Sequence, residues 1–461
     1  MFNIKNINKN KIGLIGINNI KYTYGDILKK SEEINSFIEK KSLILIVCRN
    51  SIESIIGYIS FLENNHITII LDHSFKEDYV NKIIKLYKPQ YIYSDAFFFK
   101  IQNKYKKLYS FKNFNLYKSS YKKNFNINKK NYILLSTSGT TQNPKFVRIS
   151  KNNIKNNTMN IIDYLKIRKN HTAITTMPMG YSYGLSIINT HLYAEAQILV
   201  NELTIFDKNF WKNVNKFKVT SIGGVPQFYE YLMKLRLNNL PISKIKYFTQ
   251  AGGKLSKNVT NYFSDICKKN KIKLYIMYGQ TEASPRMSYL EPNKINIKKG
   301  SIGKPLKNTS FHISGKNDKI IKKAFVKGEL IFKGKNVSLG YANNFKDLKK
   351  GDINKGKLFT GDIAYKDKDN FYFIIGRKKR FSKIFGIRIN LDDIEIKLKE
   401  NNYIVKCLPS SENLNLIVKE NYDVNKIKNI LQDYSGINKN YILINKVKSF
   451  NNRQTLKNYL I

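Results

Sequence analysis

The ten residues Ser136-Thr137-Ser138-Gly139-Thr140-Thr141-Gln142-Asn143-Pro144-Lys145 follow the apolar run Ile133-Leu134-Leu135. The apolar run predicts a buried strand, so the ten residues are expected to form a loop at the carboxyl end of a sheet. The hydroxyls, the lysine ammonium and a glycine that lets the backbone approach closely suit a polyphosphate ligand. The spacing is not that of a Walker loop, because Lys145 is followed by Phe146. Taken alone, such a loop is also compatible with an ordinary surface turn.

The bulk properties are those of a globular protein. The chain has 461 residues, of which 42% are hydrophobic, enough for two or three domains with a large core. No apolar run reaches the roughly 18 to 20 residues that cross a bilayer, and the N-terminus lacks the apolar core of a secretory signal. We therefore expect no transmembrane segment and a cytoplasmic location. Cys48, Cys267 and Cys407 are widely separated, which predicts reduced, mostly buried thiols and neither a zinc site nor disulfides.

The formal net charge is +48, which in other proteins often indicates a nucleic acid or an anionic membrane as partner. Here the lysines are spread along the whole chain and mixed with Asn, Ile and Tyr, and no zinc-finger or RNA-recognition motif accompanies them. We interpret the charge as incidental and expect no specific nucleic-acid partner. A nonspecific affinity for polyanions at low salt is still expected.

Helix-like and β-rich segments alternate along the chain, as in βαβ units. Predicted helices cover 24–38, 51–64 and 210–217, and predicted strands cover 43–48, 67–71, 91–94, 172–177, 221–225 and 244–250. From about Gly300, glycine-punctuated β segments at 310–314, 328–332 and 371–375 predict a smaller antiparallel or barrel-like unit.

The predicted fold class is α/β. A large N-terminal domain of stacked α/β sheets with a small β-barrel-like subdomain is expected over 1–375, followed by a small mobile α+β C-terminal domain over 376–461. The boundary falls at the basic cluster Gly376-Arg377-Lys378-Lys379-Arg380, where we expect a hinge. A solvated linker is the alternative interpretation of this cluster.

Further short motifs follow the loop at long intervals. They are Gln250-Ala251-Gly252-Gly253, Tyr278-Gly279-Gln280-Thr281-Glu282, Gly328-Glu329-Leu330, Gly340-Tyr341, Phe359-Thr360-Gly361-Asp362, Gly376-Arg377 and Lys383-Ile384-Phe385-Gly386-Ile387-Arg388. Each is weak alone, since its residues are also compatible with core, turn or helix-end roles. In this order and at these distances they resemble the adenylate-forming superfamily, which includes acyl-CoA and aryl-CoA synthetases, luciferases and peptide-synthetase adenylation domains. The resemblance extends from about Tyr22 to the C-terminus.

The resemblance implies an AMP-forming acid–thiol ligase that uses ATP and Mg²⁺. Such enzymes join a carboxylate to the α-phosphate of ATP, release pyrophosphate and pass the acyl group to a thiol. The loop would hold the β- and γ-phosphates through Thr137, Ser138, Gly139, Thr140, Thr141 and Lys145. Glu282 would hold Mg²⁺ together with Thr140, because Mg²⁺ prefers hard oxygen ligands.

The same resemblance assigns the rest of the nucleotide site. Tyr278 would stack on adenine, Gly252 and Gly253 would let the backbone approach the nucleotide, and Asp362, assisted by Arg377, would accept the ribose hydroxyls. The remaining nucleotide-binding candidates are Gly279, Gln280, Thr281 and Lys383. Lys379 is implied as the hinge around which the C-terminal domain would swing between the two half-reactions.

The stretch Pro178-Met179-Gly180-Tyr181-Ser182-Tyr183-Gly184 resembles the motif that closes the family's acyl pocket. Amino-acid-activating relatives place an Asp about where Ser182 stands, because a buried substrate ammonium needs a counter-charge. No acidic residue occurs between Met177 and Leu192, so a fatty, aryl or hydroxy acid is expected. The implied pocket residues are Tyr181, Tyr183, Gly184, Val225 and Pro226, although aromatic residues there are also compatible with plain core.

The thiol acceptor is expected to come from another molecule, because the sequence ends some 80 residues after the expected hinge, which leaves no room there for a carrier domain. Coenzyme A and the phosphopantetheine arm of a carrier protein are equally favoured, since both are anionic and the chain is basic.

Two positions depart from the family pattern. Gln142 stands where Gly is usual, and Arg453 stands where relatives place a catalytic lysine that reaches the carboxylate and the α-phosphate. Arginine keeps the charge but spreads it over a planar fork. Two alternatives remain. One is a relative that binds nucleotide or acyl-AMP but lost its chemistry through Gln142 and Arg453, and the other, based on the basic charge, is a nucleic-acid-binding protein.

Overall fold

The computed structural model describes residues 1–2, 4–96, 105–121, 127–136, 144–315, 319–378, 381–384, 387–408, 410 and 412–447. The chain divides into two compact units. The first consists of Met1–Ser136, Lys145–Thr360 and Ala364–Ile374, and the second includes Gly361–Ile363 and the described residues from Ile375 onward.

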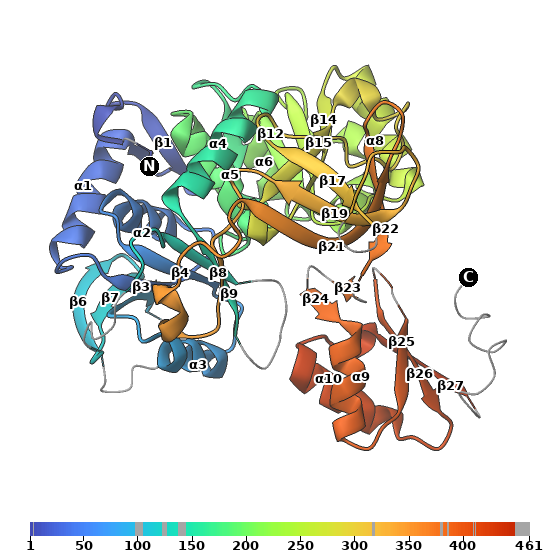
Figure 1. Cartoon of the computed structure of the whole chain (residues 1–461). Helices are drawn as coiled ribbons and strands as arrows, with labels where there is room; N and C mark the ends of the chain where they lie inside the picture. The colour runs from blue at the N-terminus through green and yellow to red at the C-terminus, as the bar shows by residue number, and fades with distance from the viewer. Residues whose placement is uncertain are drawn as a thin grey trace. The chain divides into compact units, whose positions relative to one another are not determined.

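Two large sheets form the framework of the first unit (Figure 1). One sheet has the order β20-β9-β8-β4-β3-β5-β7-β6. Its strands are Gly340–Ala342, Phe146–Ile149, Ile133–Ser136, Ile67–Asp72, Leu43–Cys48, Tyr91–Asp95, Phe114–Lys118 and Lys106–Phe111. The four strands β8, β4, β3 and β5 are mutually parallel. Every residue of β3 is buried, because a parallel strand with both faces covered meets water on neither side.

The second large sheet has the order β16-β15-β14-β13-β12-β10-β11-β1-β2. Its strands are Lys304–Pro305, Arg286–Leu290, Lys273–Gly279, Tyr247–Gln250, Ser221–Gly224, Thr172–Ile174, Gln197–Val200, Ile12–Gly16 and Lys21–Thr23. Strands β12, β13 and β14 run parallel, and β15 turns back antiparallel to β14. The carboxyl ends of the parallel strands therefore share one edge of the sheet.

Helices fill the space between the two sheets and cover their outer faces. One apolar cluster joins Ile27 of α1, Ile55 of α2 and Leu185 of α5 to Leu14 of one sheet and Ile46 of the other. Helices α6, α7 and α8 pack with the β12–β14 region in a second cluster, and α3 packs on the other sheet in a third. The helices are Tyr24–Ser36 (α1), Ile52–Glu63 (α2), Glu77–Tyr87 (α3), Lys151–Leu165 (α4), Ser182–Tyr193 (α5), Lys208–Lys216 (α6), Pro226–Lys234 (α7) and Lys257–Lys269 (α8).

Local sequence explains where several helices begin. Thr23 caps α1 by accepting from the Asp26 backbone N–H, and the Asp26 carboxylate reaches back to the Thr23 N–H. Ser150 and Asn153 form the same reciprocal arrangement at the start of α4. Such capping boxes satisfy backbone donors that the first helical turn leaves unpaired.

A smaller sheet has the order β18-β17-β19-β21-β22. Its strands are Ile320–Ile321, Ser310–Ser314, Gly328–Lys333, Lys357–Lys366 and Tyr372–Arg377. Strand β17 is antiparallel to both neighbours, as the glycine-punctuated segments predicted.

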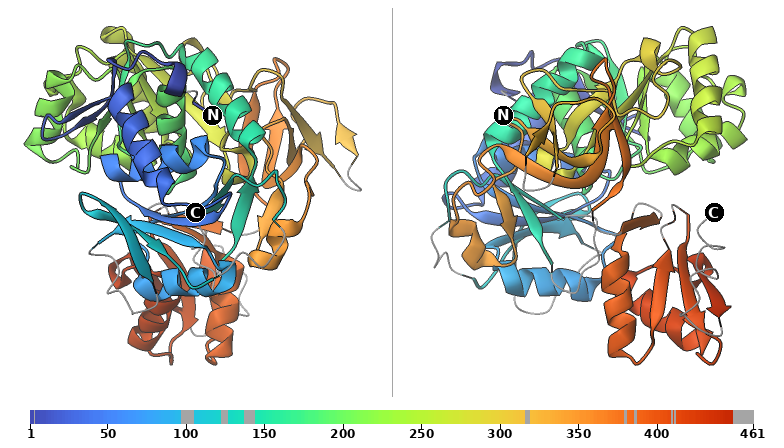
Figure 2. Two further views of the ribbon diagram at one scale, coloured as in Figure 1. Left: turned by 90° about the vertical axis from the view of Figure 1, so that its left-hand side faces the viewer. Right: turned by 45° about the vertical axis from the view of Figure 1, so that its right-hand side comes forward.

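The second unit contains an antiparallel pair, β23 (Phe381–Ile384) and β24 (Ile387–Asn390), and a three-stranded sheet of β25 (Val405–Leu408), β26 (Leu414–Lys419) and β27 (Ile442–Val447). Helices α9 (Leu391–Glu400) and α10 (Val424–Ser435) pack on this sheet around a core of its own (Figure 2). The predicted α/β fold class, with a large and a small part, is confirmed.

Some predicted element ends are wrong. The strand predicted over 172–177 ends at Ile174, and the one predicted over 244–250 begins at Tyr247. In both cases the surplus residues are not part of the strand ladder: the paired residues of β10 end at Ile174, and those of β13 begin at Tyr247. The three cysteines are free and buried, as predicted. Within the described ranges, no helix combines the length and apolarity needed to span a membrane.

Candidate active site

Lys145, Glu282 and Tyr341 form a connected cluster. Lys145 directly precedes β9, and β9 pairs with β20 so that Tyr341 lies opposite Val147. The Lys145 ammonium lies 3.4 Å from the centroid of the Tyr341 ring, a cation–π contact. The Tyr341 hydroxyl donates a 2.7 Å hydrogen bond to Oε1 of Glu282. Two predicted catalytic residues that are 137 positions apart therefore contact the same tyrosine.

Glu282 fits the role of a magnesium ligand. It lies in the short 3-10 helix Thr281–Ala283 and is 5% exposed, so its carboxylate is held in a buried setting. Within the described ranges, no group of three or more His, Cys, Asp or Glu residues could hold a metal ion. One carboxylate is still enough for Mg²⁺, which is commonly bound by one or two carboxylates, water and substrate phosphates. The donor set therefore suits a metal that arrives with a polyphosphate.

The other residues of the Tyr278–Glu282 motif extend from the end of β14. Tyr278 packs edge-on against Phe311, with 6.2 Å between ring centroids, and the Gln280 side chain donates to the Thr360 carbonyl over 2.9 Å. A Cβ on Gly279 would collide with the Pro285 carbonyl oxygen, so only glycine fits there. The Thr281 hydroxyl lies 3.2 Å from that of Ser182, which connects the motif to the start of α5.

Asp362 and Arg377 form an ion pair within the second unit. Arg377 Nε donates to Asp362 Oδ1 over 2.7 Å, with exposed side-chain fractions of 25% and 2% respectively. The Lys378 backbone N–H donates to the Gly361 carbonyl beside this pair. Lys383 lies in β23, where its backbone pairs with Arg388.

Several predicted residues lie outside the described part of the chain. These are Thr137, Ser138, Gly139, Thr140 and Thr141 of the loop, Gln142, the hinge candidate Lys379, and Arg453. Their assignments remain predictions.

The predicted acyl-pocket residues gather near the carboxyl ends of β12 and β13. Gly252 has a φ of +90°, and a Cβ there would lie 3.0 Å from Val225 Cγ1 and 3.4 Å from Tyr181 Oη. A Cβ on Gly253 would lie 3.0 Å from Pro226 Cγ, and one on Gly184 would collide with the Pro178 carbonyl. The structure thus brings Tyr181, Val225 and Pro226 of the predicted acyl pocket together with Gly252 and Gly253 of the predicted nucleotide site, from three separate segments.

The hydroxyl and the ring of Tyr183 each contact other residues of the site. Its hydroxyl donates to the Thr249 carbonyl over 2.7 Å and lies 2.8 Å from the Thr249 hydroxyl. Burial raises the pKa of Tyr183 to about 12, so the phenol stays protonated and can donate. The Arg286 guanidinium lies over the ring at 5.1 Å.

A small cavity of about 20 Å³ lies next to Tyr183. Its polar lining comes from α5 (Tyr183, Ser186, Thr190, His191) and from Ser221, Tyr247, Thr249 and Arg286. Sequence reasoning missed Arg286, His191 and Thr249. Positions 183, 186, 187, 190 and 191 share one face of a helix. This spacing is the sequence signal that could have identified His191 as a lining residue.

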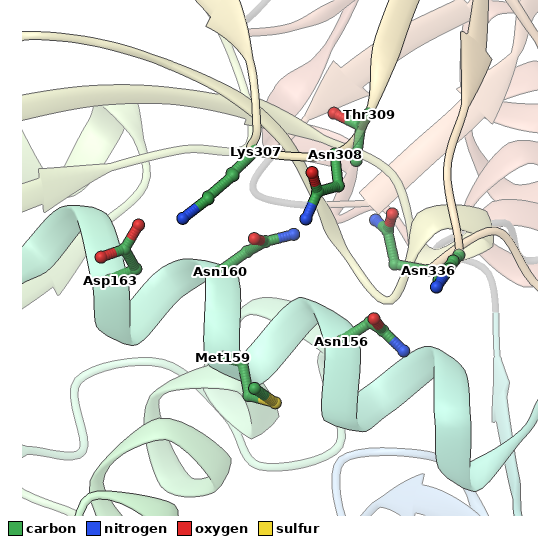
Figure 3. A pocket seen from close by; sticks show the side chains of 9 residues that line it. Asn156, Met159, Asn160, Asp163, Lys307, Asn308, Thr309 and Asn336 are labelled. Carbon is green, nitrogen blue, oxygen red and sulfur yellow. The ribbon is translucent and has the colours of Figure 1, made fainter.

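A larger cavity of about 320 Å³ opens beside α4 (Figure 3). Asn156, Met159, Asn160 and Asp163 line it from the helix, and loop residues 307–309 and 335–336 line the opposite side. None of the predicted site residues lines this cavity.

The sequence model of the AMP-binding enzyme family matches residues 6–342. The chain belongs to this family.

Among curated relatives, the 2-succinylbenzoate--CoA ligase of Bacillus cereus (strain ATCC 10987 / NRS 248) is 30% identical over 247 residues, which are 53% of this chain and 49% of the relative. The chain therefore spans about half the length of the curated relatives it matches. Among solved structures, IdnL1 has a TM-score of 0.82 at 12% identity and 97% coverage of both chains. O-succinylbenzoate coenzyme A synthetase of Bacillus subtilis, in complex with ATP and magnesium ion, has a TM-score of 0.66 at 16% identity, with 96% of this chain and 94% of that chain covered.

Proposed function

We propose that this protein activates a carboxylic acid with ATP and transfers the acyl group to a thiol. The observation that supports this most directly is the buried Glu282 carboxylate, joined through Tyr341 to Lys145. An acidic metal ligand and a cation on one tyrosine suit a triphosphate, which needs both positive charge and a divalent ion.

In the first half-reaction a carboxylate oxygen attacks the α-phosphorus of ATP, the bond to the β-phosphate breaks, and pyrophosphate leaves. Lys145 would offset the charge that develops on the leaving pyrophosphate. Glu282 would hold Mg²⁺, which neutralises phosphate charge when bound. Asp362, fixed by Arg377, would accept hydrogen bonds from the ribose hydroxyls.

In the second half-reaction a thiolate attacks the acyl carbonyl, the bond to AMP breaks and a thioester forms. The acceptor would be coenzyme A or the phosphopantetheine arm of a carrier protein. The B. cereus relative is by name a CoA ligase, which favours coenzyme A as the first acceptor to test.

The proposed acid is not an α-amino acid. Ser182 is 7% exposed and lies beside the Thr281 hydroxyl, and of the described residues that line the small cavity none is Asp or Glu. A buried ammonium would have no counter-charge there.

The proposal is tested by incubating the protein with ATP, Mg²⁺ and mixed carboxylic acids and measuring ATP–pyrophosphate exchange and acyl-AMP mass. Exchange that depends on an added acid supports the ligase. Nucleotide binding without exchange for any acid would instead identify a catalytically impaired relative. RNA binding with sequence preference would favour the nucleic-acid alternative.

A further inference from the structure

Arg286 is a buried arginine without the partners that such a residue normally has. It lies at the start of β15, and its whole residue is 2% exposed. Its Nε has no hydrogen-bond partner, and across the described ranges no carboxylate forms an ion pair with it. A buried charge is costly unless it is paired and hydrogen-bonded, so this side chain needs an explanation.

Arg148 shows what a purely structural buried arginine looks like in the same protein. It is 0% exposed, and its guanidinium donates to the carbonyls of Leu339, Tyr341, Lys350 and Gly351. All three of its nitrogens are thereby satisfied. The contrast indicates that Arg286 is not held in place by the fold in the same way.

Arg286 lines the small cavity together with His191, whose Nε2 also has no partner among the described residues. The Ser186 and Thr190 hydroxyls donate to carbonyls of their own helix and so do not compensate the charge. Of the described lining residues, Arg286 alone carries a permanent charge. The cavity is therefore a cationic site within a mainly apolar pocket.

The shape of the cavity limits what it can take. Its volume of about 20 Å³ admits one small polar group. A Cβ on Gly223 would lie 2.8 Å from Tyr183 Oη and 2.9 Å from Thr249 Oγ1, so the glycine keeps this space free of a side chain. The lining residues of α5 extend over positions 183–191, about 12 Å along the helix axis at about 1.5 Å per residue. Ser182, which contacts the Thr281 hydroxyl next to Glu282, begins the same helix.

The Tyr183 ring offsets part of the buried charge through its 5.1 Å cation–π contact. The guanidinium N–H groups point outward in the plane of the group, however, and a ring that lies against its face accepts no hydrogen bond from them. Nε therefore stays without a hydrogen-bond partner. A carboxylate accepts two parallel N–H bonds and cancels the charge, which neither a ring nor a water molecule does.

We propose that Arg286 binds a second carboxylate on the acid substrate, so that the preferred substrates are dicarboxylic acids activated at their other end. This inference rests on the proposed ligase function. Arg286 is then a specificity-determining residue that contacts the remote end of the substrate. An acid without the second carboxylate leaves the buried cation unpaired and is disfavoured for that reason.

The test compares acids of equal carbon number in acid-dependent ATP–pyrophosphate exchange: succinate with butyrate, adipate with hexanoate, and suberate with octanoate. The ω-hydroxy acids of the same lengths form a third arm. For the wild-type protein we expect kcat/KM to be at least tenfold higher for the dicarboxylate in the pair of best-fitting length. Equal or higher values for monocarboxylates or hydroxy acids would overturn the inference and leave the ligase function standing.

Variants separate a specificity role from a structural one. Arg286→Met should lose the preference for dicarboxylates through a raised KM, while Arg286→Lys should retain part of it. Arg148→Met is the matched control and should lower thermal stability without changing the order of preference. A preference that persists in Arg286→Met would contradict the assignment, and the wild-type panel decides the question if that variant does not fold.

A binding measurement covers the case in which no acid supports exchange, which would overturn the ligase proposal. Adipate or suberate should then still raise the melting temperature of the wild-type protein more than the matched monocarboxylate does. The Arg286→Met variant should not show this difference. Equal rises in the melting temperature of the wild-type protein with both acids would overturn the inference as well.

Discussion

The Tyr341 hydroxyl donates to Glu282 Oε1 over 2.7 Å, and the two residues are 59 positions apart. The hydrogen bond occupies one oxygen of the carboxylate. The same ring lies beneath the Lys145 ammonium at 3.4 Å. Tyr341 therefore positions both charged groups of the proposed phosphate site.

Removing the hydroxyl tests this positioning role. Tyr341→Phe keeps the ring under Lys145 but deletes the hydrogen bond to Glu282. We expect the Mg²⁺ concentration for half-maximal pyrophosphate exchange to rise about three- to tenfold, which corresponds to the roughly 1 kcal/mol typical of a lost hydrogen bond. The measurement is a Mg²⁺ titration at saturating ATP.

Tyr132→Phe is the matched control, because the buried Tyr132 hydroxyl donates to the Leu62 carbonyl. Tyr132→Phe should lower the free energy of unfolding by the roughly 1 kcal/mol of a lost hydrogen bond and leave the Mg²⁺ titration unchanged. If both variants shift the titration equally, Tyr341 has no special role.

Gly252 is expected to tolerate no side chain. Its φ of +90° is unfavourable for other residues, and an added Cβ would lie 3.0 Å from Val225 Cγ1. We expect Gly252→Ala to destabilise the protein by about 1 to 2 kcal/mol and to raise KM for the acid. Urea unfolding and exchange kinetics measure the two effects. Gly351→Ala, where a Cβ meets nothing within 4 Å, should change neither.

The fold class was predictable where an apolar run ends in a polar or glycine-containing motif. The predicted strand before the Ser136–Lys145 loop is β8, and the strand predicted to end at Gln250 is β13, which ends there. Strand ends were less predictable, since β10 stops at Ile174 for lack of further pairing. Local sequence does not contain that information.

The missed site residues depend on long-range packing. Tyr341 lies opposite Val147, beside Lys145, because β20 pairs with β9, and this register cannot be read from either segment alone. Arg286 looks like an ordinary strand residue until its missing partners are known. Conversely, the Gly340-Tyr341 motif was visible in the sequence, but nothing local assigned it a role.

Asp362→Asn tests the proposed ribose site. The substitution removes the charge that pairs with Arg377 and one acceptor for the ribose hydroxyls. We expect KM for ATP to rise at least tenfold, with a smaller effect for Arg377→Gln, whose side chain is 25% exposed. Asp369→Asn, at an ion pair with a 66% exposed carboxylate, serves as control and should leave KM for ATP unchanged. An equal response of Asp362→Asn and the control would remove Asp362 from the site.

Arg453 lies outside the described residues, so its prediction rests on chemistry alone. An ammonium is a compact point charge, whereas a guanidinium spreads its charge over a planar fork. If Arg453 takes the place of the family's catalytic lysine, Arg453→Lys should raise pyrophosphate exchange several-fold. Exchange that stays the same or falls would exclude Arg453 from this role.

His66 makes stability depend on pH. The Ser42 backbone N–H donates to Nδ1 over 3.1 Å, and Nε2 donates to Asn35 Oδ1 over 2.9 Å, so the neutral ring satisfies both partners. Burial, together with the nearby Lys41, lowers the pKa of His66 from 6.5 to about 4. Protonation of Nδ1 would also break the bond from Ser42.

The two pKa values of His66, 6.5 unfolded and about 4 folded, determine how the free energy of unfolding changes with pH. Above pH 6.5 the ring is neutral in both states and stability is fully present. Between pH 6.5 and about 4 the unfolded chain binds a proton that the folded protein does not, so stability falls as the pH falls. The contribution of this histidine is at most about 1.4 kcal/mol per pH unit.

Urea unfolding at pH 7.5, 6.0 and 5.0 measures this slope. His66→Asn retains an acceptor near the position of Nδ1 but does not titrate, so its free energy of unfolding should fall less steeply with acid than that of the wild type. Its stability at pH 7.5 will be lower, because the contact with Asn35 is lost. Parallel pH profiles for the two proteins would show that other groups cause the acid sensitivity, and the buried His191, whose pKa is also lowered to about 4 by burial, is the next residue to substitute.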